Sequence, residues 1–152
     1  MLNNGDQAPQ ISIPTDIGHF SLAEQGGKKV VIFFFPRADT SGCTKQAIQF
    51  SALGAAFAAE NAIVIGISKD TPAKQAKFRE KHQLTCLLGA DNESDACEQF
   101  GTWVEKSMYG KRYMGIQRAS FIIDGDGKIV AVWPKVKADG HAQIVLDQLK
   151  SL

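Results

Sequence analysis

Residues 29–44, KVVIFFFPRADTSGCT, join a continuous apolar run to a polar turn that ends on a cysteine. The apolar, β-branched and aromatic residues from Lys29 to Phe35 are typical of a strand buried on both faces of a sheet. Pro36 ends this run, and the turn behind it leads into a helix that should begin near Gly42. The stretch therefore predicts a central strand followed by a helix that carries Cys43 in its first turn.

The segment that follows continues this pattern with a helix and a second strand. The helix is predicted from Gly42 to Glu60, and a second buried strand covers Ala62–Ser68. The apolar side chains expected to face the core from the helix are Ala47, Phe50, Leu53 and Phe57. A strand, a helix and a strand in this order form a right-handed parallel unit.

The second half of the chain repeats the alternation more loosely. The predicted elements are a helix opened by Thr71 and Pro72 and ending at His82, a strand at 85–91, a helix at 94–100, a hairpin at 119–133, and a helix from Gly140 whose inward residues are Val145, Leu149 and Leu152. Together these elements predict an α/β fold, in which a mixed central sheet has helices on both faces.

Composition limits the classes of function that are possible. The 152 residues fit a single domain, residues 1–152, and the formal net charge of +1 gives no attraction to nucleic acid or to a membrane surface. The longest apolar run is too short to span a bilayer, and the first ten residues lack a signal-peptide pattern. No large surplus of apolar residues suggests an interface, so we expect a monomer.

Cysteine usage points to a reducing compartment. Three cysteines, an odd number without close spacing, argue against a disulfide framework and fit a cytoplasmic protein. The chain has no pair of cysteines two residues apart and no cluster of cysteine and histidine with zinc-ligand spacing. We therefore expect no metal and no other cofactor.

Cys43 has a chemical advantage at the start of a helix. Backbone N–H groups there lack partners, and the positive end of the helix dipole favours the thiolate, which is the reactive form of cysteine. Gly42 admits a close approach of backbone to a ligand, and Thr40 places a hydroxyl three residues before the sulfur. The alternative is an inert core cysteine, because Cys43 also extends the buried stripe of Ala47 and Phe50 by one turn.

The loop PRADTSGCT resembles the active-site loop of peroxiredoxins, with Pro36, Thr40 and Cys43 at the positions of their motif. The segments FFFPRADTSGCT, VIGISKDTPAKQAKF, YGKRYMGIQRASFIIDGDGKI and VKADGHAQIVLDQL are similar to the Q-type branch, the bacterioferritin comigratory proteins, over nearly the whole chain. The resemblance implies a thioredoxin-like fold. It also implies an antioxidant thiol peroxidase that reduces hydrogen peroxide and small organic hydroperoxides through a sulfenic acid on Cys43.

The same resemblance implies which residues assist Cys43. Thr40 and Arg118 would bind the reacting oxygens and favour the thiolate, with Pro36 as the third motif residue. Backbone N–H groups at Gly42 and Cys43 would complete the substrate pocket. From its position alone, Arg118 would instead be a solvated charge at the start of a strand. The histidines, which lie in hydrophilic contexts and are expected at the surface, are His19, His82 and His141.

A sulfenic acid must be reduced by a second thiol. Two-cysteine members of this branch carry the resolving cysteine five residues after the first or on the following helix, and here Ile48 and Arg79 occupy those positions. Cys86 and Cys97 remain, each either as core filler or as a resolving thiol that would need local unfolding. The leading interpretation is a one-cysteine enzyme that is reduced by thioredoxin, glutaredoxin or glutathione.

Two other functions compete with the peroxidase. A disulfide oxidoreductase on the same fold requires a pair of redox cysteines, and the SGCT turn provides only one. A peroxide-sensing switch or a holdase-like module would use Cys43 without efficient turnover. Catalytic consumption of peroxide, as opposed to a single stoichiometric oxidation, separates the peroxidase from this last alternative.

Overall fold

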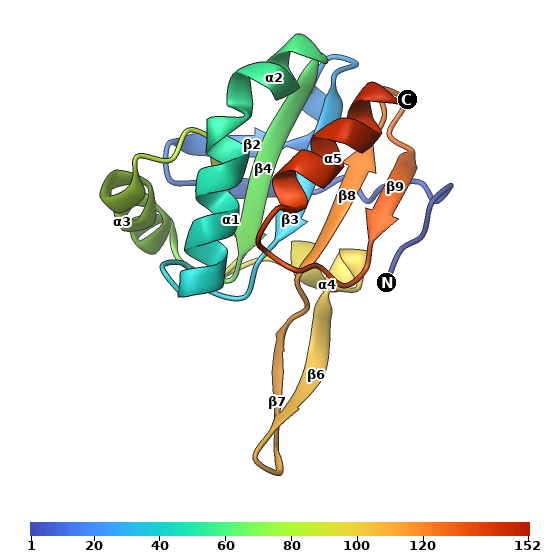
Figure 1. Ribbon diagram of the computed structural model, residues 1–152. Helices are drawn as coiled ribbons and strands as arrows, with labels where there is room; N and C mark the ends of the chain where they lie inside the picture. The colour runs from blue at the N-terminus through green and yellow to red at the C-terminus, as the bar shows by residue number, and fades with distance from the viewer.

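The computed structural model describes residues 1–152, and its centre is a seven-stranded sheet in the order β2-β1-β5-β4-β3-β8-β9 (Figure 1). The strands are β1 (Ser12–Thr15), β2 (Gly18–Ser21), β3 (Lys29–Phe34), β4 (Ala62–Ser68), β5 (Leu87–Ala90), β8 (Ala119–Ile123) and β9 (Ile129–Trp133). β3 pairs in parallel with β4 and antiparallel with β8. The sheet is therefore mixed, as predicted, and the apolar run of the opening segment lies near its middle.

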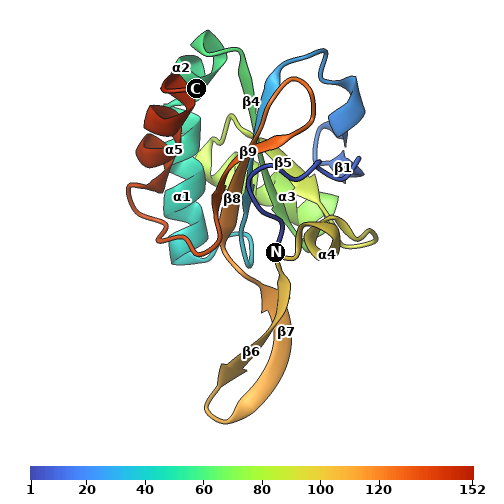
Figure 2. The same ribbon diagram turned by 90° about the vertical axis from the view of Figure 1, so that its right-hand side faces the viewer.

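Helices cover both faces of this sheet. They are α1 (Ser41–Ala52), α2 (Gly54–Ala59), α3 (Pro72–His82), α4 (Ala96–Phe100) and α5 (His141–Lys150), with a 3-10 turn at Leu22–Glu24. In Figures 1 and 2, α1, α2 and α5 lie on one face, α4 lies on the other, and α3 lies at the edge of the molecule beside α1. None of the helices combines the length and the apolar character that a membrane crossing requires.

β3 supplies alternate side chains to two separate cores. Phe33 and Phe35 join the core under α1, where the Phe33 ring stacks on Phe50 at a centroid distance of 4.4 Å. Phe34 points to the opposite core and packs against Phe100 at 5.3 Å. Successive side chains of a strand point to opposite faces, so a run that is apolar at every position suits a strand covered on both sides.

The structure corrects two of the predicted helix boundaries. The helix predicted from Gly42 to Glu60 is two helices, because Leu53 has non-helical angles (φ −95°, ψ 9°) and a glycine with poor helix propensity follows it. Leu152, predicted to face inward, is 52% exposed because α5 ends at Lys150. The N-cap predicted at Thr71 is confirmed, since its side chain accepts a hydrogen bond from the Lys74 backbone N–H.

A second, two-stranded sheet projects from the body of the molecule (Figures 1 and 2). It consists of β6 (Trp103–Met108) and β7 (Lys111–Ile116). This hairpin extends from the end of the main sheet at which β3 ends and β8 begins. Tyr109 and Gly110 both adopt positive φ, 52° and 77°, as a tight hairpin turn requires. The composition and periodicity of the chain did not predict this hairpin.

Candidate active site

Cys43 lies in the first turn of α1, just beyond the end of β3, and is only 1% exposed. The antiparallel register of β3 and β8 pairs Phe34 with Ala119. Arg118, just before β8, therefore lies at the same end of these strands as the loop that leads to Cys43. Arg118 Nη2 donates a hydrogen bond to Cys43 Sγ at 3.2 Å. Two segments that are 75 residues apart thus meet at the sulfur.

The start of α1 adds a second source of positive potential. Its N-cap residue, Thr40, makes no side-chain cap hydrogen bond, and no acidic residue lies in the first turn. The first N–H groups of a helix have no partner within the helix, and the dipole is positive at that end. An anion at Cys43 Sγ, or an oxygen bound against it, is therefore stabilised by both the guanidinium and the helix.

Gly42 makes room for the arginine. A Cβ added at Gly42 would lie 3.3 Å from Arg118 Nη2 and 3.9 Å from Ala138 Cβ. Gly42 was expected to let the backbone come close to a ligand. In the structure, the group that comes close to the helix at Gly42 is the Arg118 guanidinium. A larger residue would displace the donor from the sulfur.

Gln46 is a member of the site that the sequence alone did not reveal. It is fully buried one turn after Cys43, and its Oε1 accepts a hydrogen bond from Arg118 Nη1 at 2.5 Å. Cys43 and Gln46 thus each accept a hydrogen bond from a different nitrogen of the Arg118 guanidinium. Gln46 Nε2 is buried without a partner. A polar residue among the apolar residues on the inward face of α1 was the signal that could have revealed it.

The charge around Cys43 is positive. Arg118 and Lys106 take no part in the ion pairs of the structure. Burial, and then the charge of Arg118, lower the pKa of Lys106, and the same two causes lower the pKa of His141. Uncompensated cations in a site with little water stabilise thiolate and developing oxyanions.

Thr40 and Pro36 are exposed, whereas Cys43 is buried. The Thr40 hydroxyl donates to the Arg37 carbonyl oxygen at 2.9 Å, and its side chain is exposed. Its proton is therefore directed at the loop backbone and not at the sulfur. Pro36 is exposed at the start of the same loop. The structure brings Cys43, Gly42 and Arg118 together and leaves these two residues at the rim.

Carboxylates anchor the loop before Cys43 to its neighbours. Asp70 is buried and accepts the Ala38 N–H at 2.8 Å. Asp39 has a positive φ of 63° and contacts Lys81 Nζ and His82 Nε2 of α3, each at 2.8 Å. These two partners hold the pKa of Asp39 below its ordinary value. His82, expected at the surface, is half-buried because of this contact.

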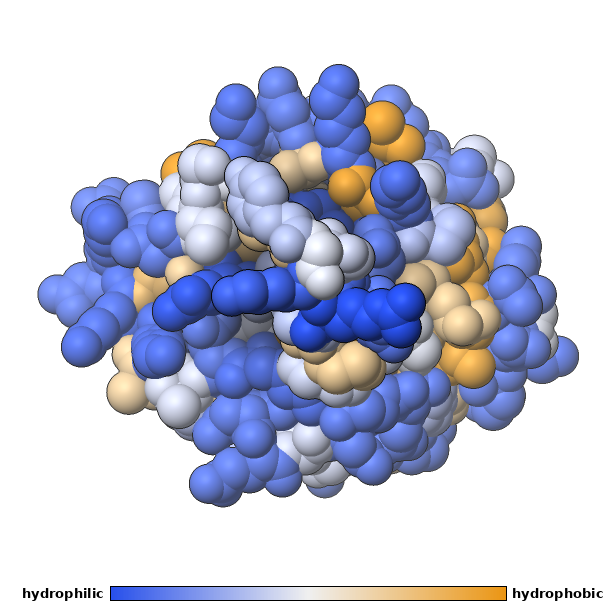
Figure 3. Space-filling model, turned by 90° about the horizontal axis from the view of Figure 1, so that it is seen from below, coloured by the Kyte–Doolittle hydropathy of each residue, from blue (hydrophilic) through white to orange (hydrophobic).

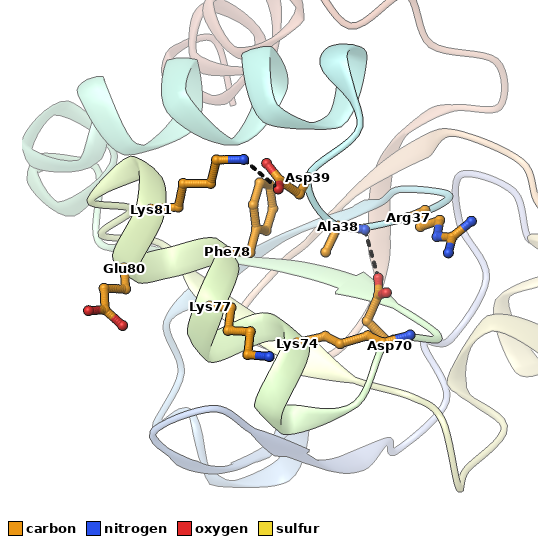
Figure 4. A pocket seen from close by; sticks show the side chains of 9 residues that line it. All are labelled: Arg37, Ala38, Asp39, Asp70, Lys74, Lys77, Phe78, Glu80 and Lys81. Atoms are coloured by element: carbon orange, nitrogen blue, oxygen red, sulfur yellow. Dashed lines mark hydrogen bonds and ion pairs between the residues drawn. The ribbon is translucent and has the colours of Figure 1, made fainter.

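A groove of about 570 Å³ runs between this loop and α3 (Figure 4). Arg37 lines it from the loop, and Lys74 and Lys77 line it from α3. The ion pairs of the structure do not involve these three cations. Cys43 does not line the groove, but residues 37–39 of the loop that leads to Cys43 do.

His141 is buried, which corrects the prediction of a surface residue; His19 is exposed as predicted. His141 opens α5, and its Nε2 lies 2.8 Å from Ser120 Oγ. Its ring packs edge-on against Trp133 at a centroid distance of 5.5 Å. Burial, followed by the charge of Arg118, lowers the pKa of His141 to about 4.

This histidine should make the fold sensitive to acid. Above a pH of about 6.5 it is neutral in both states; between that value and about 4 only the unfolded chain gains the proton. The free energy of unfolding should therefore fall by about 3 kcal/mol across this range on account of His141 alone. Urea unfolding at both ends of the range should show a smaller fall for His141→Gln. Equal falls in the two proteins would show that His141 is not kept neutral.

Cys86 is distant from Cys43 in this structure. Its Sγ accepts a hydrogen bond from Ser51 Oγ at 3.6 Å, and Ser51 lies eight residues beyond Cys43 on α1. Eight residues of α-helix span about 12 Å. A disulfide needs Cα atoms within about 7 Å of each other. Burial raises the pKa of Cys86, which further reduces its nucleophilic character.

Cys97 lies on the other side of the sheet. It belongs to the core that contains Phe34, whereas Cys43 belongs to the core that contains Phe33. Its backbone N–H donates to Asp91 at 2.8 Å, and burial and the charge of Asp91 raise the pKa of the Cys97 thiol. All three cysteines are free and buried. A bond between Cys97 and Cys43 would require a large rearrangement.

Known proteins match the chain over nearly its full length. Residues 4–132 match the AhpC/TSA family. Peroxiredoxin Bcp of Escherichia coli K12 is 42% identical over 150 residues, 98% of this chain and 96% of that protein. Peroxiredoxin Bcp of Bacillus subtilis is 39% identical over 149 residues, which are 97% of this chain and 95% of that protein. A structure of Xanthomonas campestris bacterioferritin comigratory protein, described for alkyl peroxide reduction, superposes with a TM-score of 0.90 at 32% identity and covers 99% of this chain and 97% of its own.

Proposed function

The chain belongs to the AhpC/TSA family and is a thiol-dependent peroxidase related to the Bcp peroxiredoxins, and we propose that Cys43 is the thiol that attacks the peroxide. The observation that best supports this assignment is the 3.2 Å hydrogen bond from Arg118 to Cys43 Sγ at the positive end of α1. Neither Cys86 nor Cys97 has a cation hydrogen-bonded to its sulfur.

The proposed reaction uses the residues that surround the sulfur. The thiolate attacks one peroxide oxygen in line, the O–O bond breaks, water or an alcohol leaves, and Cys43 becomes a sulfenic acid. Arg118 and the first N–H groups of α1 stabilise the charge that develops on oxygen. Thr40 joins them when its hydroxyl turns from the Arg37 carbonyl to the bound peroxide. Pro36 stiffens the start of the loop.

The substrates proposed are hydrogen peroxide and small organic hydroperoxides, in an antioxidant role. Alkyl peroxide reduction is the activity described for the Xanthomonas protein, and its likeness to this chain supports the same class of substrate here. We propose that a monomer is active, because the composition has no large surplus of apolar residues that would suggest an interface. Three free thiols favour a reducing compartment such as the cytoplasm.

We propose one-cysteine turnover, with an external thiol as the reductant. Ile48 and Arg79 occupy the two family positions for a resolving cysteine, and Arg79 forms an ion pair with Asp16 and donates to the carbonyl oxygens of Leu84 and Cys86. Thioredoxin, glutaredoxin and glutathione are the candidate donors. The cations in the groove beside the loop suit the carboxylates of glutathione.

Peroxide consumption with a panel of these three donors tests the proposed function. An enzyme consumes many equivalents of peroxide per chain with at least one donor. A redox switch or holdase-like module would stop after one oxidation of Cys43. The named relatives favour the enzyme, and turnover with none of the donors would contradict one-cysteine catalysis.

Removal of the other cysteines should leave turnover intact. Cys86→Ser and Cys97→Ser are each expected to retain turnover within about twofold, because neither sulfur lies within bonding distance of Cys43 in this fold. Non-reducing peptide mapping after one equivalent of peroxide should show no internal disulfide. Excess peroxide should convert the sulfenic acid to sulfinic acid, since no neighbouring thiol competes. A disulfide to Cys43, lost together with turnover in the matching serine variant, would refute the one-cysteine mechanism.

A further inference from the structure

The reaction leaves a strongly basic oxygen in a site with little water. When the O–O bond of hydrogen peroxide breaks, the leaving hydroxide has a conjugate acid, water, with a pKa of about 15.7, so a proton delivered to it lowers the barrier. Cys43 is 1% exposed, and Gln46, which contacts the same guanidinium, is fully buried. The proton is therefore better supplied by a side chain at the site than by bulk water.

The residues already described are poor donors of that proton. A guanidinium donates hydrogen bonds to oxygens without giving up a proton, so Arg118 can hold the peroxide but cannot protonate it. The Thr40 hydroxyl can turn from the Arg37 carbonyl oxygen to bind the peroxide, but an alcohol is no stronger an acid than water and so does not supply the proton. His141 has a pKa of about 4, so it is neutral near pH 7, and its ring is held by Ser120.

Lys106 leans from the projecting hairpin toward the base of the hairpin, where β7 leads into Arg118. It lies on β6 opposite Tyr113, and it is half-buried although its neighbours Glu105 and Ser107 are exposed. Lys106 is half-buried because the aliphatic part of its side chain lies along β7. A Cβ added at Gly115 would lie 3.2 Å from Lys106 Cδ and 3.6 Å from Cε, so the side chain crosses β7 over Gly115 toward the base of the hairpin.

Burial is the first influence on the charge of Lys106, and the charges of Arg118 and Cys43 follow it. Arg118 follows β7 by two residues, and after burial it is the charge of Arg118 that lowers the pKa of Lys106, whereas Cys43 acts in the opposite direction. No carboxylate is paired with its ammonium. Lys106 is therefore an unpaired cation, near both Cys43 and Arg118, that releases a proton more readily than an ordinary lysine.

We propose that the Lys106 ammonium delivers the proton to the leaving oxygen when Cys43 attacks the peroxide. This inference rests on the proposed function of Cys43. The S–O bond forms as the O–O bond breaks, the sulfur loses two electrons, and the peroxide gains them. The leaving oxygen takes one proton from Lys106, which becomes a neutral amine and regains a proton from solvent. Figure 3 shows strongly hydrophilic side chains across the middle of this lower face, where the hairpin points to the viewer and solvent can restore that proton.

Peroxides with different leaving groups test this role. Hydrogen peroxide needs the proton, whereas peracetic acid expels a carboxylate whose conjugate acid has a pKa of about 4 and which leaves as a stable anion. In Lys106→Met, the stopped-flow rate of Cys43 oxidation by hydrogen peroxide should fall about a hundredfold, as for loss of a general acid. The rate with peracetic acid should fall by less than about threefold.

Two further variants make the test specific. Lys106→Arg keeps the positive charge but does not release a proton, so it should show the same selective loss. Lys111→Met removes an exposed lysine on the same face, at the turn of the hairpin, and should change neither rate. An equal loss with both peroxides would make Lys106 an electrostatic or packing residue, and no loss would remove it from the mechanism. Either result overturns the proposal, and Cys43 would still form a sulfenic acid.

Discussion

Cys43→Ser should reduce peroxide consumption to the uncatalysed background while the protein remains folded. A serine hydroxyl in this position has no general base to activate it, and the hydrogen bonds that stabilise a thiolate cannot ionise an alcohol. The side chain is buried but similar in volume, so the free energy of unfolding should change by only about 1 kcal/mol. Peroxide consumption with a saturating thiol donor and urea unfolding measure the two quantities.

Cys86→Ser is the matched control for this variant. It also replaces a buried thiol by a hydroxyl, but at a sulfur that contacts Ser51 near the opposite end of α1. It should keep full turnover, which separates the chemistry of one sulfur from the general loss of a buried thiol. If folded Cys43→Ser consumed peroxide over many turnovers, the assignment of the peroxidatic thiol would be wrong.

Arg118→Met should slow sulfenic acid formation by about a hundredfold or more, equivalent to about 3 kcal/mol in the barrier. The substitution removes the 3.2 Å hydrogen bond to Cys43 Sγ and leaves the buried Gln46 Oε1 without its partner. Stability should fall by less than the barrier rises, because methionine retains much of the packing of the arginine stem. Stopped-flow oxidation near pH 7 measures the rate directly.

Two comparisons make the arginine result specific. Arg112→Met removes an exposed arginine that pairs with Glu105 on the hairpin, and it should leave the rate unchanged. Arg118→Lys keeps the charge but cannot present the planar pair of donors that contact Cys43 and Gln46, so it should restore only part of the rate. A near-normal rate in Arg118→Met would remove this residue from the mechanism.

The main sheet could be predicted because its segments carry strong local patterns. The continuous apolar runs at Lys29–Phe35 and Ala62–Ser68 indicate buried parallel strands, and both form, the first as far as Phe34. The hairpin at 119–133 is likewise confirmed as β8 and β9. Arg118 was placed beside Cys43 only through the family motif, because no local pattern reports a contact across 75 residues.

The remaining features depend on tertiary contacts that have no local signature. His141 is in a hydrophilic stretch of sequence, but in the fold this residue of α5 is buried against Ser120 of β8 and Trp133 of β9. β6 (WVEKSM) and β7 (KRYMGI) do not alternate polar and apolar residues, so their pattern was too weak to predict a hairpin. Cys97 could not be assigned to a face of the sheet, because the short helix that carries it has no extended periodicity.

The most direct measurement is the site of oxidation after a single turnover. The protein would be mixed with one equivalent of hydrogen peroxide, trapped at once with a dimedone-type reagent, and mapped by mass spectrometry of its peptides under non-reducing conditions. We expect the label on Cys43 alone, with Cys86 and Cys97 recovered as free thiols. A label on either of those residues, or consumption of the peroxide while Cys43 remains an unmodified thiol, would contradict the proposal that Cys43 is the peroxidatic cysteine.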